Sequence, residues 1–594
     1  MKICKNGTRF NNKNKEKESW IVVMKYKKIY EKWLNEPKVD DDTKKELEEI
    51  KNQEQEIQDR FYKDLTFGTG GLRGVIGAGS NRMNKYTIRR ATQGLVNYIK
   101  KNDAFIEGKG VAIAYDSRHY SDIFALETAL VLSANNIRAY LFDALRPTPE
   151  LSFAVRKLGC SAGIVITASH NPSEYNGYKV YGSDGGQITL DMAKGIIDEI
   201  NRVDAFNDVV MIDEQQALND DLLIYIGKEI DKSYLSEVIN LSINKNISRE
   251  VPEFEIVYTP LHGTGLMPIT KALSMLGYEN VHLVKSQVKP DGSFPTVKSP
   301  NPEEREAFNE GIKLAEEIGA DILFGTDPDS DRVGVVVRNH KGQYQVLTGN
   351  QIGALLTHYI LSSKNEINKN DVVIKTIVTS DLGAKIAKSY NATVFNTLTG
   401  FKFIGEKIKE FEETNSYNFL FGYEESYGYL SGTFVRDKDA VIASVLIVEM
   451  AAYYKMKGMS LFDAIEKIYK EYGYYAEELE SFTFKGAEGQ QKINETVEKF
   501  RDYNKLIEAF VGIEIVEDYQ LQVRRLIEAG REDTIDLPKA NVIKVYFKDQ
   551  SWVAIRPSGT EPKLKIYYST MGDSAKVSEK RMEELKCLIA KFIK

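Results

Sequence analysis

The 594-residue sequence has little cysteine and no long apolar run. Its three cysteines, Cys4, Cys160 and Cys587, lie far apart and form no CxxC pair. This spacing excludes a disulfide framework and indicates a reducing compartment. No apolar stretch approaches the ~20 residues that span a bilayer, and the Asn/Lys-rich N-terminus lacks the apolar segment of a secretory signal. We therefore expect a cytoplasmic protein with no membrane partner.

An excess of positive charge is also missing, since the formal net charge is -7. General affinity for nucleic acid needs a basic surface, so no nucleic-acid partner is expected. Small anionic ligands remain possible because local basic groups decide whether they bind. Hydrophobic content of 42% and charged content of 28% are ordinary for a globular protein. A chain of this length is too long for one core and predicts about three to five domains.

Strands and helices alternate three times along the middle of the chain. Each repeat has an apolar strand, a helix, a second strand, and a third strand that ends in a polar loop. This alternation predicts α/β domains with largely parallel sheets. The predicted strands are Val111–Tyr115, Ala139–Phe142 and Gly163–Ile166, then Glu255–Tyr258, Val281–Val284 and Asp321–Phe324, then Val372–Val378, Thr393–Phe395 and Phe419–Phe421. The C-terminus differs, because residues 542–568 predict a hairpin-containing sheet and residues 575–593 a closing helix.

The third strand of the first repeat runs into a loop over Thr167–Pro172, with Ser169 at its tip and His170 beside it. In open α/β sheets, ligands bind at the carboxyl ends of the strands. The loop therefore places a hydroxyl and an imidazole where a ligand would lie. By its residues alone, it is also typical of an ordinary Ser/Asn/Pro turn.

The third strand of the second repeat is followed by Asp327, Asp329 and Asp331, which alternate at period two. In an extended segment three such carboxylates share one side, where they repel each other unless a cation lies among them. An EF-hand is excluded, because its sixth position would be Arg332 rather than Gly and its twelfth Arg338 rather than Glu. By its residues alone the pattern is equally typical of a solvated acidic turn. As a metal site it fits a hard divalent ion, most simply Mg²⁺, better than an EF-hand.

Four stretches occur together and in one order: Ser169-His-Asn-Pro, Gly325-Thr-Asp-Pro-Asp-Ser-Asp-Arg, Gly422-Tyr-Glu-Glu-Ser-Tyr-Gly, and Arg556-Pro-Ser-Gly-Thr-Glu-Pro-Lys. Together they resemble the phosphoserine, metal, sugar and phosphate loops of the α-D-phosphohexomutases, the family of phosphoglucomutase and phosphomannomutase. The resemblance covers roughly residues 24–594. It implies three similar mixed α/β domains and a smaller C-terminal α+β domain around a central cleft.

The resemblance also implies domain boundaries. They are a disordered extension over residues 1–23, then domains over residues 24–245 (phosphoserine loop), 246–355 (metal loop), 356–490 (sugar-binding loop) and 491–594 (phosphate-binding loop).

Roles for individual residues follow from the same resemblance. As catalytic groups it implies Ser169 as the phosphoserine, with His170, Lys179 and Arg73 around it. As ligands of one Mg²⁺ per subunit it implies Asp327, Asp329, Asp331 and an oxygen of phospho-Ser169. As substrate contacts it implies Arg332, Thr399, Gly400, Lys402, Glu424, Ser426, Lys438, Arg556, Ser558, Gly559 and Thr560. Without it, Lys179 reads as a surface lysine and the segment from Arg556 as a tight turn.

The implied reaction interconverts glucose 1-phosphate and glucose 6-phosphate through glucose 1,6-bisphosphate. The Glu424-Glu425-Ser426 form is similar to that of glucose-handling members. Phosphopentomutase is the first alternative and phosphomannomutase the second. A non-catalytic sugar-phosphate-binding protein is the rival from another class, and a metal-dependent phosphatase is a further one. The partners expected are small sugar phosphates, and the expected state is a monomer or weak homodimer.

Overall fold

The computed structural model describes residues 25–68, 70–102, 109–484, 486–557 and 563–593. The expected disordered extension over residues 1–23 lies outside these residues. The chain divides into two compact units. The first comprises the residues up to Asp231 together with His262–Thr264 and Pro290–Pro300, and the second comprises the rest. Among the described residues, none of the helices combines the length and the apolar character needed to cross a membrane.

The first unit is built on a six-stranded sheet with the order β1-β5-β4-β2-β3-β6. Its strands are β1 (Gly71–Val75), β2 (Val111–Tyr115), β3 (Ala139–Phe142), β4 (Ala162–Ile166), β5 (Tyr175–Gly182) and β6 (Leu223–Ile226). Strands β2, β3, β4 and β6 pair in parallel, whereas β5 is antiparallel to both of its neighbours. The central strands β2 and β4 are buried on both faces, which explains their nearly unbroken apolar runs.

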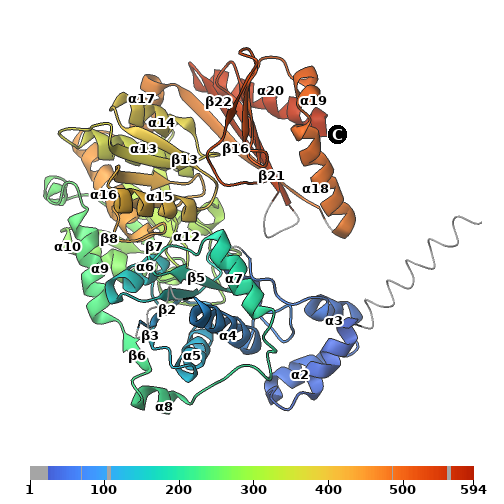
Figure 1. The fold of residues 1–594 in the computed structure, drawn as a ribbon. Helices are drawn as coiled ribbons and strands as arrows, with labels where there is room; N and C mark the ends of the chain where they lie inside the picture. The colour runs from blue at the N-terminus through green and yellow to red at the C-terminus, as the bar shows by residue number, and fades with distance from the viewer. Residues whose placement is uncertain (1–24, 69, 103–108, 485, 558–562, 594) are drawn as a thin grey trace, which may run out of the picture. The chain divides into compact units, whose positions relative to one another are not determined.

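Helices cover both faces of this sheet (Figure 1). The helices of this unit are a helix over 25–35, α2 (Asp41–Glu49), α3 (Glu54–Phe61), α4 (Lys85–Lys101), α5 (Ser121–Ala134), α6 (Thr148–Leu158), α7 (Leu190–Ile200) and α8 (Glu214–Asn219). The helix over 25–35, α2 and α3 pack together in a separate apolar cluster instead of on the sheet. Helix α5 connects β2 to β3 in one direction across the sheet, and α6 connects β3 back past β2 to β4. Because such crossovers are right-handed, the two helices lie on opposite faces.

The second unit contains three sheets, with the orders β11-β10-β9-β7-β8, β13-β12-β14-β15 and β16-β22-β21-β20-β17-β18-β19. The strands of the first two are β7 (Ile256–Thr259), β8 (Val281–Leu283), β9 (Ile322–Thr326), β10 (Val333–Arg338), β11 (Tyr344–Val346), β12 (Asp371–Thr376), β13 (Thr393–Thr397), β14 (Asn418–Tyr423) and β15 (Tyr429–Ser431). Their helices are α9 (Lys228–Asn240), η1 (Ile247–Glu250), α10 (Leu266–Met275), α11 (Lys285–Val288), η2 (Arg305–Phe308), α12 (Asn309–Ile318), α13 (Gly349–Ser362), α14 (Asp381–Ser389), α15 (Phe401–Thr414), α16 (Ala440–Met456) and α17 (Leu461–Tyr472).

The three α/β repeats share one topology, which confirms the predicted fold class. In each, a central parallel strand (β2, β7 or β12) is flanked on one side by the second strand and on the other by the third. All nine predicted strands lie within two residues of their observed bounds. The prediction of largely parallel sheets was incomplete, because each third strand folds back into an antiparallel partner, β5, β10 or β15. The three polar loops are therefore equivalent turns, β4–β5, β9–β10 and β14–β15.

The C-terminal α+β part is larger than its sequence predicts. Its sheet contains β16 (Tyr474–Thr483), β17 (Ile513–Asp518), β18 (Val523–Leu526), β19 (Arg531–Thr534), β20 (Ile543–Phe547), β21 (Trp552–Pro557) and β22 (Lys563–Gly572). Strand β16 lies before residue 491, the predicted start of the fourth domain, yet it pairs with β22 along ten residues. Its glutamate-containing sequence looks like a linker because β16 is an edge strand with half of its residues exposed. The boundary predicted between residues 355 and 356 likewise falls inside α13.

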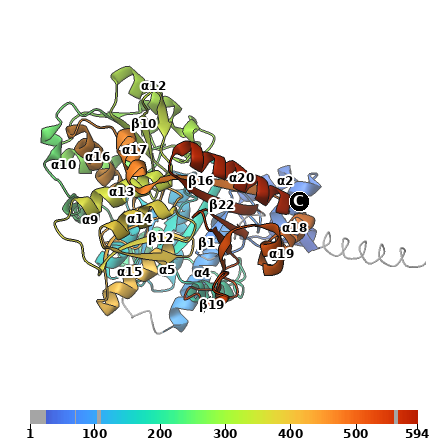
Figure 2. The same ribbon diagram turned by 90° about the horizontal axis from the view of Figure 1, so that it is seen from above.

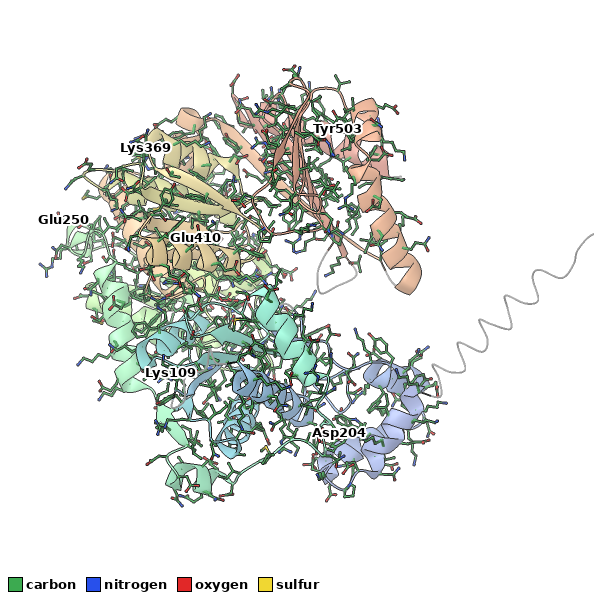
Figure 3. All side chains as sticks on the ribbon, viewed as in Figure 1. Lys109, Asp204, Glu250, Lys369, Glu410 and Tyr503 are labelled. Atoms are coloured by element: carbon green, nitrogen blue, oxygen red, sulfur yellow. The ribbon has the colours of Figure 1, made fainter. Side chains whose placement is uncertain are left out.

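Three helices, α18 (Gly486–Arg501), α19 (Tyr503–Ala509) and α20 (Ala575–Ile593), cover one face of the C-terminal sheet (Figures 1 and 2). Their apolar side chains and those of the sheet form one core, which includes Phe500, Phe510 and Ile589. Figure 3 shows the side chains of both units, with Lys109 and Asp204 labelled in the first and Glu250, Lys369, Glu410 and Tyr503 in the second. Each of these two units is compact by itself and carries its own loops.

Candidate active site

The loop between β4 and β5 holds Ser169 in an unusual backbone conformation. Its φ is 54°, in the left-handed region that non-glycine residues seldom occupy, and the residue is 3% exposed. The backbone amide of Ser169 donates to Thr167 Oγ1 at 2.8 Å. The Oγ of Ser169 lies 3.1 Å from Nδ1 of His170. The serine and the histidine predicted from the sequence are therefore in hydrogen-bond contact.

A buried carboxylate anchors the start of this loop. Asp116, at the carboxyl end of β2, is 1% exposed and accepts hydrogen bonds from Thr167 Oγ1 at 2.6 Å and from Ser121 Oγ at 2.8 Å. It also accepts a hydrogen bond from the backbone amide of Arg118 at 2.9 Å. Asp116 therefore joins the end of β2 to the start of the serine loop, at the edge of the sheet where Ser169 lies.

Arg73 and Lys179 lie on neighbouring antiparallel strands of the first unit. In the register of β1 and β5, Arg73 faces Gly177 and Lys179 faces Gly71. The two cations are therefore diagonal neighbours on the same face of the sheet. Nη1 of Arg73 donates to Oδ1 of Asn171, in the serine loop, at 3.3 Å. Arg73 is exposed and Lys179 is partly buried.

The loop between β9 and β10 gathers three buried carboxylates. Asp327, Asp329 and Asp331 are at most 1% exposed, and each offers an oxygen within 4.8 Å of those of the others. A tight turn brings them together rather than the extended segment that their spacing suggests. Within it, the amide of Ser330 donates to the carbonyl of Asp327 at 3.0 Å, and Ser330 has a φ of 51°. Oδ1 of Asp327 also accepts hydrogen bonds from the backbone amides of Asp331 and Arg332, each at 3.0 Å.

The charge of this cluster fits a divalent cation. Lys438 contributes one positive charge, with Nζ 2.8 Å from Oδ2 of Asp331 and 3.5 Å from Oδ1 of Asp437. Burial opposes ionisation of this lysine, yet the surrounding carboxylates raise its pKa. The three carboxylates and Asp437 outnumber the two nearby cations, Lys438 and Arg332, and a hard cation with oxygen ligands balances this excess of negative charge. The residues can therefore bind a metal ion.

The loop between β14 and β15 places Glu424 beside two cations and a backbone amide. Its Oε1 accepts the amide of Gly400 at 2.9 Å, and the residue is 5% exposed. Burial raises the pKa of Glu424 to about 7, although Lys438 and Arg332 oppose this rise. Gly400 has a φ of 119°, a conformation that suits glycine, and it precedes the first residue of α15.

Arg332 connects the aspartate loop to the rest of the second unit. It forms an ion pair with Glu303, and its Nε lies 3.9 Å from Oδ1 of Asp331. Burial opposes its charge, but Glu303 and Asp331 raise its pKa. Sequence reasoning missed Glu303, because nothing local in its charged segment marks it. The structure therefore brings Arg332, Glu424 and Lys438 together around the aspartate loop.

The remaining predicted contacts are only partly described. Thr399, Lys402 and Ser426 are partly buried, and burial lowers the pKa of Lys402. Arg556 lies on β21 opposite Lys565 of β22, whose pKa is lowered by burial and then by Arg556. Sequence reasoning missed Lys565, although its alternation with Lys563 on a strand was a usable signal. The predicted contacts Ser558, Gly559 and Thr560 lie outside the described residues.

The predicted site residues belong to both units. The first unit contains Ser169, His170, Lys179 and Arg73, and the second contains the three aspartates with the predicted sugar and phosphate contacts. That Ser169 completes the metal site stays a prediction for this reason.

Four family models match the chain in succession. They describe the phosphoglucomutase/phosphomannomutase alpha/beta/alpha domains I, II and III, matched at residues 64–206, 232–342 and 348–472, and the C-terminal domain of the same proteins, matched at residues 494–586. Together these matches cover most of the sequence.

Curated relatives and solved structures agree with these matches. The chain is 42% identical over 519 residues to a phosphoglucomutase of Staphylococcus haemolyticus, covering 86% of this chain and 92% of that protein. It is 38% identical over 535 residues to a phosphoglucomutase of Staphylococcus epidermidis, covering 89% and 95%. Among solved structures, pp63/parafusin from Paramecium has a TM-score of 0.68 at 18% identity, covering 89% of this chain and 95% of that one. A phosphoglucomutase/phosphomannomutase family protein from Burkholderia thailandensis has a TM-score of 0.64 at 18% identity, covering 89% and 97%. These two structures support the fold.

Proposed function

The chain belongs to the phosphoglucomutase/phosphomannomutase family, and on that premise we propose that it interconverts α-D-glucose 1-phosphate and glucose 6-phosphate. The enzyme is an intramolecular phosphotransferase of the isomerase class. The observation that carries the proposal is the match to phosphoglucomutases over 86% of the chain or more, in a chain that keeps the serine loop and the aspartate triad. We also propose a cytoplasmic enzyme that acts as a monomer or weak homodimer.

Ser169 is the proposed carrier of the phosphoryl group. The P–Oγ bond of phospho-Ser169 breaks as a P–O bond forms to the free sugar hydroxyl, which gives glucose 1,6-bisphosphate. The other phosphoryl group of this intermediate then returns to Oγ of Ser169, and the isomeric monophosphate leaves. In the first transfer the sugar hydroxyl loses a proton, for which Lys179 is the proposed acceptor and His170 the second candidate, and the departing Oγ of Ser169 gains a proton. In the second transfer Oγ of Ser169 loses its proton and the departing sugar oxygen gains one, so the proton balance closes. Arg73 supplies positive charge for the phosphoryl oxygens, because a guanidinium matches phosphate geometry.

Mg²⁺ is the proposed ion for the triad of Asp327, Asp329 and Asp331, with an oxygen of phospho-Ser169 as a further ligand. When bound, it would neutralise charge on the phosphoryl oxygens, which is the main requirement of phosphoryl transfer. The aspartates would hold the ion. Asp327 also stabilises the turn that brings them together, because its carboxylate accepts hydrogen bonds from the amides of Asp331 and Arg332. Glucose 1,6-bisphosphate is the proposed activator, since it phosphorylates Ser169.

Sugar recognition is proposed for the second unit. Glu424 and Ser426 would accept and donate hydrogen bonds to ring hydroxyls, while Arg332 and Lys438 hold Glu424 by charge. The contacts proposed to complete the sugar and distal-phosphate sites are Thr399, Gly400, Lys402, Arg556, Ser558, Gly559 and Thr560. The substrate must bind in two orientations, which suits groups that recognise hydroxyls rather than one end of the sugar.

A coupled spectrophotometric assay tests the function. Purified protein with Mg²⁺ and a trace of glucose 1,6-bisphosphate receives glucose 1-phosphate, mannose 1-phosphate or ribose 1-phosphate in parallel. We expect the highest kcat/KM on glucose 1-phosphate, with loss of turnover in EDTA. A preference for ribose 1-phosphate would keep the mechanism and change the substrate to a pentose phosphate. Absence of turnover on all three would favour a sugar-phosphate-binding protein.

The pH dependence of KM tests the role of Glu424. Burial raises the pKa of this carboxyl to about 7. Below that pH the carboxyl is protonated, and it accepts a hydrogen bond from a sugar hydroxyl less well. We expect KM for glucose 1-phosphate to rise as the pH falls from about 8 to about 6. Glu424→Gln is the matched control, since its amide does not titrate and the phosphate of the substrate titrates equally with both proteins. An identical pH dependence of KM in the variant would contradict the role.

A further inference from the structure

One buried arginine donates to the backbone of nearly the whole serine loop. Arg118 follows Asp116 at the end of β2, and its side chain is fully buried. Its Nη2 donates to the carbonyls of Ser169, at 2.6 Å, and of Asn171. Its Nη1 donates to the carbonyls of Pro172, at 2.8 Å, and of Tyr175, at 2.9 Å. A guanidinium is suited to this task because its donors diverge in one rigid plane.

Between Ser169 and Pro172, the one carbonyl that Arg118 does not reach is that of His170, and a distant part of the sequence holds it. Oγ of Ser299 donates to the carbonyl of His170 at 2.7 Å. Ser299 belongs to the segment Pro290–Pro300, which we call the arm and which packs within the first unit. Arg118 and Ser299 together therefore engage each carbonyl from Ser169 to Pro172.

The arm is itself tightly fitted against the residues around Arg118. The ring of Phe294 lies under the guanidinium, 5.0 Å from its central carbon, and is 1% exposed. A Cβ at Gly292 would lie 2.4 Å from the amide nitrogen of His119, so only glycine permits this approach. The arm thus locates Ser299 independently of the loop that Ser299 holds.

Holding the backbone of the loop determines the direction of the Cα–Cβ bond that carries the reactive hydroxyl. Peptide units are planar, and every peptide bond in the described residues is trans, so two successive peptide units that are both held fix the φ and ψ of the residue between them. For Ser169 these are the unit whose amide donates to Thr167 and the unit whose carbonyl accepts from Arg118. The left-handed conformation of Ser169 is unfavourable and persists only when its surroundings enforce it. Phosphoryl transfer depends on in-line placement of the donor, and a displacement of ~1 Å can cost about a hundredfold in rate.

We propose that Arg118 and Ser299 are positioning residues for Ser169, and that the arm Pro290–Pro300 serves to hold Ser299 against the serine loop. Neither side chain contacts the reacting atoms in this role. Both act through the loop backbone, which they hold so that Oγ of Ser169 keeps its orientation. This inference rests on the proposed function, since it assigns the orientation of the proposed phosphoryl carrier.

The experiment compares wild type, Ser299→Ala, Ser299→Thr and the matched control Ser293→Ala. Ser293 lies on the same arm, but its hydroxyl meets the ring of His119, 2.9 Å away, instead of the serine loop. Enzyme phosphorylated with glucose 1,6-bisphosphate is assayed for kcat and KM on glucose 1-phosphate. Hydrogen exchange of the backbone amides of residues 168–175 is measured in parallel, together with the melting temperature.

For Ser299→Ala we expect kcat to fall about tenfold with KM within about twofold. The loop amides should exchange faster, and the melting temperature should stay near that of the wild type. Ser299→Thr, which keeps the hydroxyl, should restore kcat, and Ser293→Ala should behave as wild type. Arg118→Lys should lower kcat further, because an ammonium cannot reach all the carbonyls that the guanidinium reaches.

Ser299→Ala with the kcat and exchange rates of Ser293→Ala would overturn the proposal. So would a loss confined to KM, or a Ser299→Thr variant as slow as Ser299→Ala. These outcomes require an active wild type, and an inactive wild type would instead overturn the proposed function. Faster exchange of the loop amides in Ser299→Ala is measured without turnover, so it tests the contact in either case.

Discussion

Ser169→Ala is expected to lower kcat on glucose 1-phosphate by at least about a thousandfold, because the variant lacks the oxygen that carries the phosphoryl group. Alanine lacks only the hydroxyl, and the contacts of Arg118 and Thr167 to the backbone of this residue do not depend on it. The loop should therefore keep its conformation. The coupled assay measures the loss, and mass spectrometry of the peptide with Ser169 measures phosphorylation by glucose 1,6-bisphosphate.

The control is Ser173→Ala, in the same loop but partly exposed and outside the proposed site. It should retain both turnover and phosphorylation. Rapid release of inorganic phosphate by Ser169→Ala would identify a phosphatase that uses metal-activated water. Wild-type mutase turnover in Ser169→Ala would mean that another group carries the phosphoryl group, and it would refute the mechanism proposed above.

Asp329→Asn is expected to weaken Mg²⁺ binding and to lower kcat about a hundredfold or more, since the ion neutralises the transferring group. Asp329 is a better choice than Asp327, whose carboxylate also accepts two backbone amides and so builds the turn. Titration with Mg²⁺, followed by calorimetry and by activity, measures both effects. Asp536→Asn, at an exposed position of the same unit, is the control for loss of one negative charge.

Thermal unfolding should show opposite effects of Asp329→Asn in two buffers. In EDTA the variant should melt above the wild type, because one of three mutually repelling buried carboxylates is neutral. In Mg²⁺ the wild type should gain stability by binding the ion to its native state, and the variant should gain little. An equal Mg²⁺-dependent rise in both proteins would contradict the assignment of Asp329 as a ligand.

Much of the fold could be predicted because its signals are local. The strand Val111–Tyr115 is an uninterrupted β-branched and alanine-rich run, and both faces of it are buried in the structure. The three polar loops follow directly from strands of this kind, so their positions along the chain could be read from residue order. The aspartates could be grouped for the same reason, because a turn of five residues is itself a local structure.

The β16 strand shows where local signals are insufficient. Half of its residues are exposed, three of the ten are glutamates, and the pairing with β22 that makes them a strand joins positions about 90 residues apart. An edge strand pairs through its backbone, and this pairing does not require apolar side chains at alternate positions. The sequence of β16 therefore resembles a linker. The antiparallel strands β5, β10 and β15 were missed because they follow loops whose polar residues dominated the pattern.

The candidate site residues could be proposed from residue order, because a serine, three aspartates and a glutamate each lie on a short loop that follows a strand. The groups that hold those residues were not readable. Arg118 reaches Ser169 across 51 positions of sequence, and Ser299 reaches His170 across 129. The pKa of Glu424 likewise depends on the folded chain, because burial raises it while Lys438 and Arg332, from other elements, oppose the rise. Contacts of this kind have no period and no spacing rule, because folding brings the partners together and nothing in the intervening chain encodes their meeting.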